Sequence, residues 1–180
     1  MPRWVPNFFT IARLVLVPVI IRAILAGKAG QALAVFVCAA VTDLLDGATA
    51  RAFRITSQSG AYLDPIADKA LLSGVYLALA AAGEMPWWLV FVIFGRDIYL
   101  LLAAGLLLCF TTRRKFPPSW WGKASTFVQI ATAVIWMVRD LMRVSVLDSV
   151  ASAMLWPCAA LTIWSGVHYT WRGVQIAQAH

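Results

Sequence analysis

Charged side chains are scarce in this sequence, and their scarcity excludes an ordinary water-soluble protein. Only 13% of the 180 residues are charged, 62% are hydrophobic, and the mean hydropathy is +0.79. Soluble domains carry about 25% charged residues, whereas a membrane-spanning helix needs about 20 predominantly apolar ones. The composition predicts an all-α integral membrane protein in which residues 1–180 form a single membrane domain.

Cysteine and histidine are also rare, which argues against sites built from them. The three cysteines, Cys38, Cys109 and Cys158, stand singly in separate apolar segments, so neither a disulfide framework nor a cysteine-rich metal site is expected. His168 and His180 have no partner pattern around them. We also expect no cleavable signal peptide, because Arg13 and several prolines interrupt the first apolar run.

Glycine and proline divide the chain into six apolar segments, each long enough to cross a bilayer. An interfacial N-terminal segment, or an aromatic anchor for the first crossing, is expected around Trp4, Phe8 and Phe9. The predicted transmembrane helices cover residues 8–26, 30–53, 61–83, 87–111, 120–143 and 149–170.

The distribution of basic residues predicts the orientation in the membrane. With the N-terminus in the cytoplasm, Lys28 and Arg143 fall near the opposite face, whereas seven basic residues fall at or near cytoplasmic boundaries: Arg3, Arg54, Arg113, Arg114, Lys115, Lys123 and Arg172. The net charge of +7 then suits anionic headgroups and phosphates. No long basic stripe indicates nucleic-acid binding. We expect a bacterial-type inner membrane protein whose functional site faces the cytoplasm.

Half of the eight acidic residues lie close together in otherwise apolar segments: Asp43, Asp46, Asp64 and Asp68. The spacings of three and four residues place each pair on one face of its helix. A short connection over residues 54–60 lets two antiparallel helices turn these faces together. The pattern therefore predicts four carboxylates around one cavity near the cytoplasmic surface.

Such a cluster requires a positive charge, because an ionised carboxylate inside a membrane costs on the order of 3 kcal/mol. Arg51 and Lys69 are near in sequence, but flexible cations match a compact oxygen cluster poorly. Mg²⁺ or Mn²⁺ prefers carboxylate and water oxygens. We infer a site for one or two metal ions, which is typical of phosphoryl chemistry.

The small residues Gly47 and Ala50 share the helical stripe of Asp43, where a bulky ligand could approach the backbone. Tight helix packing is the alternative explanation for small residues. Arg51 could contact a phosphate or pair with an aspartate, and its spacing leaves both open.

The stretch Asp43-x2-Asp46-Gly47-x2-Ala50-Arg51-x8-Gly60-x3-Asp64-x3-Asp68 resembles the signature of the CDP-alcohol phosphotransferase family at every fixed position. The resemblance implies a six-helix, usually homodimeric membrane enzyme that transfers a substituted phosphate from a CDP-linked alcohol and releases CMP. It implies metal binding by Asp43, Asp46, Asp64 and Asp68, with Asp68 also the general base. The implied CDP-binding residues are Asp46, Gly47, Ala50, Arg51 and Gly60.

The resemblance extends to bacterial phosphatidylglycerophosphate synthases and to the cardiolipin synthases of this fold. Its further elements are Asn7, Thr10, Arg13 and Pro18, the Arg96-Asp97 pair, and the stretch Gly122-Lys123-x2-Thr126-x2-Gln129. The implied donor is CDP-diacylglycerol. Ser125 stands where glycerophosphate-using members often have Lys, and together with Asp97 it is closer to cardiolipin synthases.

Glycerol 3-phosphate is the acceptor that we favour, and phosphatidylglycerol is the alternative. Arg113, Arg114, Lys123 and Thr126 are the candidate acceptor-binding residues. The basic cluster from Arg113 to Lys115 could instead anchor the loop to lipid headgroups.

Arg96 and Asp97 are adjacent in an apolar run, so we expect them to project in different directions and not to neutralise each other. A tie to another helix and a role in acceptor binding are both open.

Two other classes of function compete with the enzyme. An intramembrane cation transporter would need polar groups continuing to the far side of the membrane, and segments such as LLSGVYLALAAAG have almost none. A noncatalytic scaffold predicts a degraded acidic cluster, whereas this cluster is intact.

Overall fold

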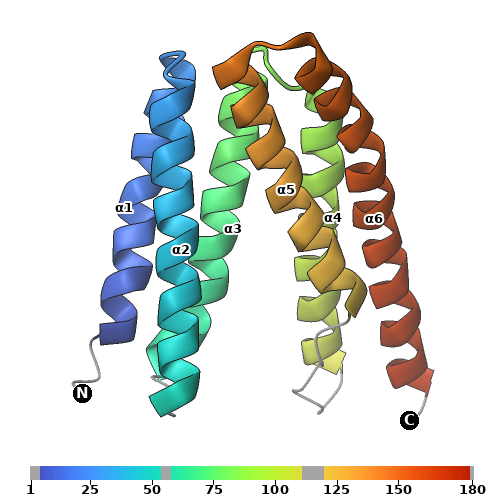
Figure 1. The fold of residues 1–180 in the computed structure, drawn as a ribbon. Helices are drawn as coiled ribbons and strands as arrows, with labels where there is room; N and C mark the ends of the chain where they lie inside the picture. The colour runs from blue at the N-terminus through green and yellow to red at the C-terminus, as the bar shows by residue number, and fades with distance from the viewer. Residues whose placement is uncertain (1–4, 54–57, 111–119, 179–180) are drawn as a thin grey trace. The chain divides into compact units, whose positions relative to one another are not determined.

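A computed structural model describes residues 5–53, 58–110 and 120–178, and all of its regular structure in these ranges is helical. Pro18 and Pro157 lie inside their helices without ending them. The helices, shown in Figure 1, are α1 (Val5–Leu25), α2 (Ala29–Phe53), α3 (Gln58–Ala81), α4 (Trp87–Phe110), α5 (Trp120–Met142) and α6 (Ser145–Gln178).

The expected helix order is confirmed, with two differences at the chain's ends. α1 runs unbroken from Val5 to Leu25, so these residues contain no separate interfacial helix. α6 extends well beyond the predicted segment 149–170, because residues 145–148 and the residues after Thr170 continue the helix. The prediction of an all-α protein is therefore correct.

Glycines in the left-handed conformation end two of the helices. Gly27 has φ 67° and Gly83 has φ 79°, a region that a residue with a Cβ rarely adopts. The N–H of Gly27 donates to the Ile24 carbonyl, and the N–H of Lys28 donates to the Ala23 carbonyl. This pair of bonds is the Schellman arrangement, which satisfies carbonyls left open at a helix end.

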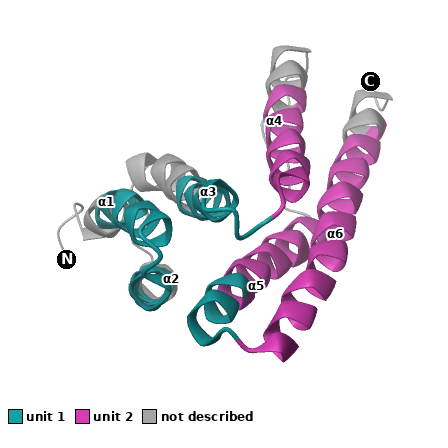
Figure 2. Cartoon of the chain, turned by 90° about the horizontal axis from the view of Figure 1, so that it is seen from above, with its two compact units in different colours: residues 1–85, 136–143 teal, residues 86–135, 144–180 magenta. Residues whose placement is uncertain are grey.

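The chain divides into two compact units, which are distinguished by colour in Figure 2. The first comprises residues 1–85 and 136–143, and the second comprises residues 86–135 and 144–180. α5 contributes its first part to the second unit and its last two turns to the first.

In the first unit, α1 packs against both α2 and α3. α1 and α3 run in the same direction, and α2 runs opposite to them (Figure 1). The contact between α1 and α3 is close at Gly74, where an added Cβ would lie 3.0 Å from Val17 Cγ1 and 3.2 Å from Ile21 Cδ1. Buried apolar side chains such as Ile20 and Tyr76 complete this core.

The end of α5 is tied to the turn after α3 within the same unit. Arg139 Nη1 donates to Glu84 Oε2 at 2.9 Å. The Arg139 guanidinium also lies over the ring of Trp136, 4.9 Å from its centroid. A cation between a carboxylate and an aromatic face is stabilised from both sides.

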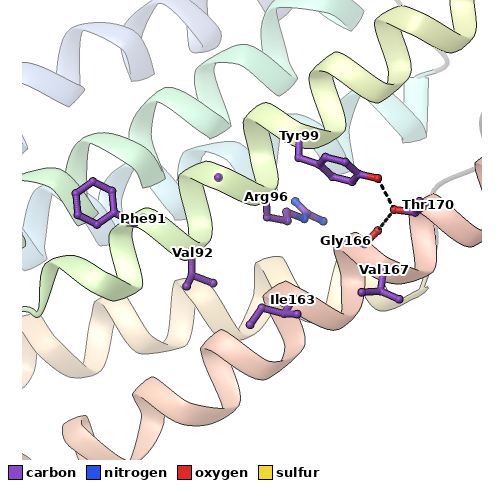
Figure 3. A pocket seen from close by; sticks show the side chains of 9 residues that line it. Phe91, Val92, Arg96, Tyr99, Ile163, Gly166, Val167 and Thr170 are labelled. Atoms are coloured by element: carbon purple, nitrogen blue, oxygen red, sulfur yellow. Dashed lines mark hydrogen bonds between the residues drawn. The ribbon is translucent and has the colours of Figure 1, made fainter.

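In the second unit, α4 packs against α6. The two helices run parallel, because residue numbers increase in the same direction along both of them. Trp88 contacts Trp156, Arg96 forms a hydrogen bond with Ser165, and Tyr99 forms a hydrogen bond with Thr170 (Figure 3). Leu89 on α4 and Cys158 on α6 are fully buried.

Large apolar side chains cover much of the described surface. Leu101 is 74% exposed, Phe127 72% and Trp156 72%, and they lie on three different helices. Soluble monomers rarely expose such extended apolar surface. Within the described residues, one stretch, Ser145–Arg172, is both long and apolar enough to cross a membrane, and the apolar stretches Ala29–Thr42 and Lys69–Ala81 are shorter.

We predict that Gly74→Leu destabilises the protein by about 1–3 kcal/mol, because the new side chain must push α1 away from α3. The measurement is the thermal unfolding midpoint in detergent. Gly95→Leu is the matched control, since a Cβ at Gly95 meets no atom within 4 Å. Equal midpoints for the two variants would contradict close packing at Gly74.

Candidate active site

The predicted catalytic residues lie on the two helices that pack against α1. Asp43, Asp46, Gly47, Ala50 and Arg51 belong to α2, and Gly60, Asp64 and Asp68 belong to α3. The side chains of these eight residues lie outside the described part of the structure, as do Arg113 and Arg114 entirely. Their helical positions can nevertheless be compared.

Both aspartate pairs lie at matching distances from the connection between α2 and α3. Asp43 is ten residues before the end of α2, and Asp68 is ten residues after the start of α3. At 1.5 Å per residue, each is about 15 Å along its helix from the connection. Asp46 and Asp64 are both about 10 Å from it by the same measure. Because α2 and α3 run in opposite directions, the four positions form two matched levels.

Arg13 supplies a buried positive charge at one of these levels. Its side chain is 3% exposed on α1, which packs against both aspartate-bearing helices. Val17 lies against Gly74, and one turn earlier on each parallel helix are Arg13 and Ala70. Along the helix axes, the position of Arg13 on α1 is therefore within about one turn of the position of Asp68 on α3.

Arg13 was part of the family resemblance, but no role beside the aspartates was predicted for it. The signal was present, because an arginine inside an apolar helix must have a partner of opposite charge or a set of hydrogen-bond acceptors. What the sequence lacked was the register of α1 against α3, which the close contact at Gly74 sets.

Arg96 and Asp97 do neutralise each other, so the expectation that they would not is wrong. Arg96 Nη1 donates to Asp97 Oδ1 at 2.8 Å, because the long arginine side chain folds back to its neighbour. Arg96 Nη2 donates to Ser165 Oγ on α6 at 2.6 Å. The alternative of a tie to another helix is thus confirmed, and a role in acceptor binding stays a prediction.

The stretch that opens α5 is divided between two faces of the helix. Lys123 and Thr126 are exposed, and Thr126 Oγ1 donates to the Gly122 carbonyl at 3.1 Å. Ser125 and Gln129 are 1% and 2% exposed. The candidate acceptor residues Lys123 and Thr126 therefore share an exposed face, and Ser125 does not belong to it.

Ser125 and Gln129 face α6, where they meet Thr162. Gln129 Nε2 donates to Thr162 Oγ1 at 3.0 Å, and Thr162 Oγ1 donates to the Cys158 carbonyl at 2.7 Å. The hydroxyls of Ser125 and Thr162 are 3.4 Å apart. A lysine at position 125 would have to displace this buried contact, which explains why a small hydroxyl residue suits this chain.

The described side chains contain no group of three or more His, Cys, Asp or Glu residues that could hold a metal ion. The metal site therefore remains a prediction based on the four aspartate positions. Carboxylates at two matched levels offer the hard oxygen ligands that Mg²⁺ and Mn²⁺ prefer.

Comparison with known proteins identifies the family. The sequence model described as "CDP-alcohol phosphatidyltransferase" matches residues 3–164. The chain belongs to the CDP-alcohol phosphatidyltransferase family. Members of this family are enzymes, so family membership favours a transferase over the transporter and scaffold alternatives.

Relatives within the CDP-alcohol phosphatidyltransferase family carry two kinds of name. A "Probable phosphatidylglycerophosphate synthase" of Mycobacterium tuberculosis is 35% identical over 94% of this chain and 81% of its own length. A "CDP-diacylglycerol--glycerol-3-phosphate 3-phosphatidyltransferase" of Haemophilus influenzae is 30% identical over 92% of this chain and 90% of its own length. A "Cardiolipin synthase (CMP-forming)" of Rattus norvegicus is 32% identical over 97% of this chain and 64% of its own length.

We predict that Thr162→Val lowers the free energy of unfolding by about 1–3 kcal/mol, because Gln129 and Ser125 lose their partner inside the α5–α6 contact. Thermal unfolding in detergent provides the measurement. Thr126→Val is the control, since Thr126 also donates to a carbonyl of its own helix but is exposed. A Thr162→Val protein as stable as the control would show that the buried cluster contributes little.

Proposed function

We propose that this enzyme transfers the phosphatidyl group of CDP-diacylglycerol to a hydroxyl of glycerol 3-phosphate and releases CMP. The carrying observation is the placement of the four aspartates at two matched levels of α2 and α3, within a chain of this family. Support for the substrates comes from the relatives that are named for this reaction and cover nearly the whole chain.

In this proposal Asp43, Asp46, Asp64 and Asp68 hold Mg²⁺ or Mn²⁺, most suitably two ions. The ions would supply charge stabilisation for the attacking and leaving oxygens of the displacement. Arg13 would offset part of the remaining negative charge, since it is buried at the level of Asp68. Four carboxylates with fewer positive charges would repel one another too strongly to stay ionised together.

Asp68 would act as the general base. It takes the proton from the acceptor hydroxyl, and the acceptor oxygen forms a bond to the β-phosphorus of CDP-diacylglycerol. The bond between that phosphorus and the oxygen of CMP breaks, so CMP leaves as the product. Asp46, Gly47, Ala50, Arg51 and Gly60 would bind the CDP part of the donor, with the small residues giving the nucleotide access to the helix backbone.

A membrane location fits a reaction between a lipid donor and a soluble acceptor. Each of the six helices has at least 21 residues, which at about 1.5 Å per residue is enough to cross roughly 30 Å of hydrocarbon. The exposed apolar side chains described above would then face lipid. We propose six crossings of a bacterial-type inner membrane, a cytoplasmic active site and a homodimer.

Phosphatidylglycerol is the second candidate acceptor, which would make the enzyme a cardiolipin synthase. The favouring observation is the burial of Ser125 against Thr162. The chain thereby has no cation at the position where glycerophosphate-using members often carry one. Lys123, which is exposed one turn into α5, is the described residue best placed to replace that charge.

For the general base, we predict that Asp68→Asn lowers the rate of CMP release by at least about 100-fold, the usual contribution of a positioned base. CMP is measured with purified protein in detergent, CDP-diacylglycerol, glycerol 3-phosphate and Mg²⁺ or Mn²⁺. Asp148→Asn, an exposed residue in the first turn of α6, is the control and should retain activity. EDTA should abolish the wild-type rate. Asp68 would not be the base if its variant kept the wild-type rate.

The acceptor is tested in parallel reactions with glycerol 3-phosphate or phosphatidylglycerol. We predict CMP with glycerol 3-phosphate alone, and a KM for glycerol 3-phosphate about tenfold higher in Lys123→Gln, as expected for losing roughly 1.4 kcal/mol of phosphate binding. Arg143→Gln is the matched control, because Arg143 is an exposed basic residue that directly follows α5, at the opposite end of the helix from Lys123. CMP formed with phosphatidylglycerol alone would instead identify a cardiolipin synthase.

A further inference from the structure

A polar pocket lies in the first compact unit, at the end that the proposed membrane crossings place away from the cytoplasm. It is lined by residues 27–31, around the start of α2, and by Asp140, Leu141 and Arg143 at the end of α5. Asp43 is 14 residues after the start of α2, which is about 21 Å along the helix. The pocket is therefore separate from the proposed active site.

Close packing between the start of α2 and the end of α5 forms this pocket. A Cβ added at Gly30 would lie 3.4 Å from Leu141 Cδ1, so a small residue lets the two helix ends approach each other. The turn before α2 is held by the hydrogen bond from the Lys28 N–H to the Ala23 carbonyl at 2.9 Å. The backbone on both sides of the pocket is thus fixed by packing and hydrogen bonds within the unit.

The charged side chains of the pocket are of both signs. Lys28 and Arg143 are the two basic residues whose expected place near the non-cytoplasmic face departs from the positive-inside tendency. They are 115 residues apart in the sequence, and the fold brings both to one pocket. Asp140 is half-buried and supplies a carboxylate to the same lining. Among the described residues, none of these three charges has an ion-pair partner, so both signs are available to a ligand.

Arg143 occupies a position that favours glycine. Its φ is 49°, and among the described residues it is the one non-glycine residue with a positive φ. Its N–H donates to the Arg139 carbonyl at 2.8 Å, so it follows α5 where many helices have a glycine in the left-handed conformation. A residue with a Cβ is disfavoured in this conformation. The chain therefore keeps a cation beside the pocket at a position where glycine would relieve the backbone.

The two helix ends that meet here add partial charges of opposite sign. α2 begins at Ala29, and the first N–H groups of a helix have no carbonyl partner within it. α5 ends at Met142, where the last carbonyls are left open in the same way. The beginning of a helix is therefore electropositive and its end electronegative. A ligand with one anionic and one cationic group matches these surroundings, whereas a purely anionic ligand would leave Asp140 unpaired beside its own negative charge.

We propose that this pocket binds the zwitterionic headgroup of a phosphatidylethanolamine-type lipid from the non-cytoplasmic leaflet. The lipid phosphate would accept hydrogen bonds from Lys28 and Arg143 near the start of α2, and the ammonium group would donate to Asp140 at the end of α5. A lipid is the occupant because the proposed crossings place these helix ends at the level of the headgroups. The inference rests on the membrane orientation proposed above and does not depend on the transferase reaction.

The test measures lipid binding to the full-length protein in detergent by native mass spectrometry, with phosphatidylethanolamine and phosphatidylglycerol of identical acyl chains. Phosphatidylethanolamine should bind at least fivefold more tightly. Asp140→Asn should weaken its binding at least fivefold and that of phosphatidylglycerol less than twofold, because only the ammonium group uses the carboxylate. Lys28→Gln should weaken both lipids at least fivefold through the shared phosphate. Arg22→Gln and Asp148→Asn are the controls, since both residues are exposed and lie outside the pocket, and should change each Kd less than twofold.

Several outcomes would overturn the proposal. It fails if the two lipids bind wild-type protein equally, if Asp140→Asn weakens both to the same extent, or if Lys28→Gln leaves both unchanged. Lys28→Arg keeps the charge and should retain the wild-type Kd within twofold, so a loss as large as that of Lys28→Gln would indicate a structural role instead. Complete displacement of the lipid by an equal concentration of free phosphoethanolamine would show that no lipid is required. Binding is measured without turnover, so an inactive enzyme would leave the result intact.

Discussion

A charged group among apolar helices must find an opposite charge or hydrogen-bond partners, because no water is present to solvate it. This requirement explains the polar side chains in the interiors of both units. Arg96 is held by Asp97 and by Ser165, and Gln129 donates to Thr162. Since Ser165 and Thr162 lie one turn apart on α6, the two bonds fix α4 and α5 to the same segment of that helix.

The same constraint makes the aspartate cluster informative. Arg96 has a carboxylate partner of its own, whereas the four aspartates on α2 and α3 outnumber the cations of the neighbouring helices. Arg13 is buried at the level of Asp68, and one guanidinium balances only one carboxylate. A structural role would be satisfied by fewer acidic groups, since replacing a buried ion pair by apolar residues often costs nothing. Four carboxylate positions at two matched levels therefore support the proposed site for divalent cations.

The sequence predicted the helices well because their ends depend on local chemistry. Gly27 and Gly83 adopt the left-handed conformation that ends a helix, and glycines at these positions in the sequence already predicted a helix end. Predictions failed where the outcome depended on the length of a side chain or on packing between helices. α6 continued past residue 170 to Gln178, and Arg96 folded back onto Asp97. The polar pocket at the start of α2 was not predicted, because Lys28 and Arg143 are far apart in the sequence and meet only through the packing of the end of α5 against α2.

The two candidate acceptors differ in what they require of α5. Glycerol 3-phosphate is small and anionic, so its binding depends on fixed cations, whereas phosphatidylglycerol also gains from apolar contact along its chains. Position 125 cannot supply a cation, because Ser125 is buried against Thr162 and a charge there would break the contact with α6. A phosphate site on the described part of α5 must therefore use its exposed face, where Lys123 lies beside Thr126. The proposal of glycerol 3-phosphate as the acceptor thus depends on how strongly Lys123 holds a phosphate.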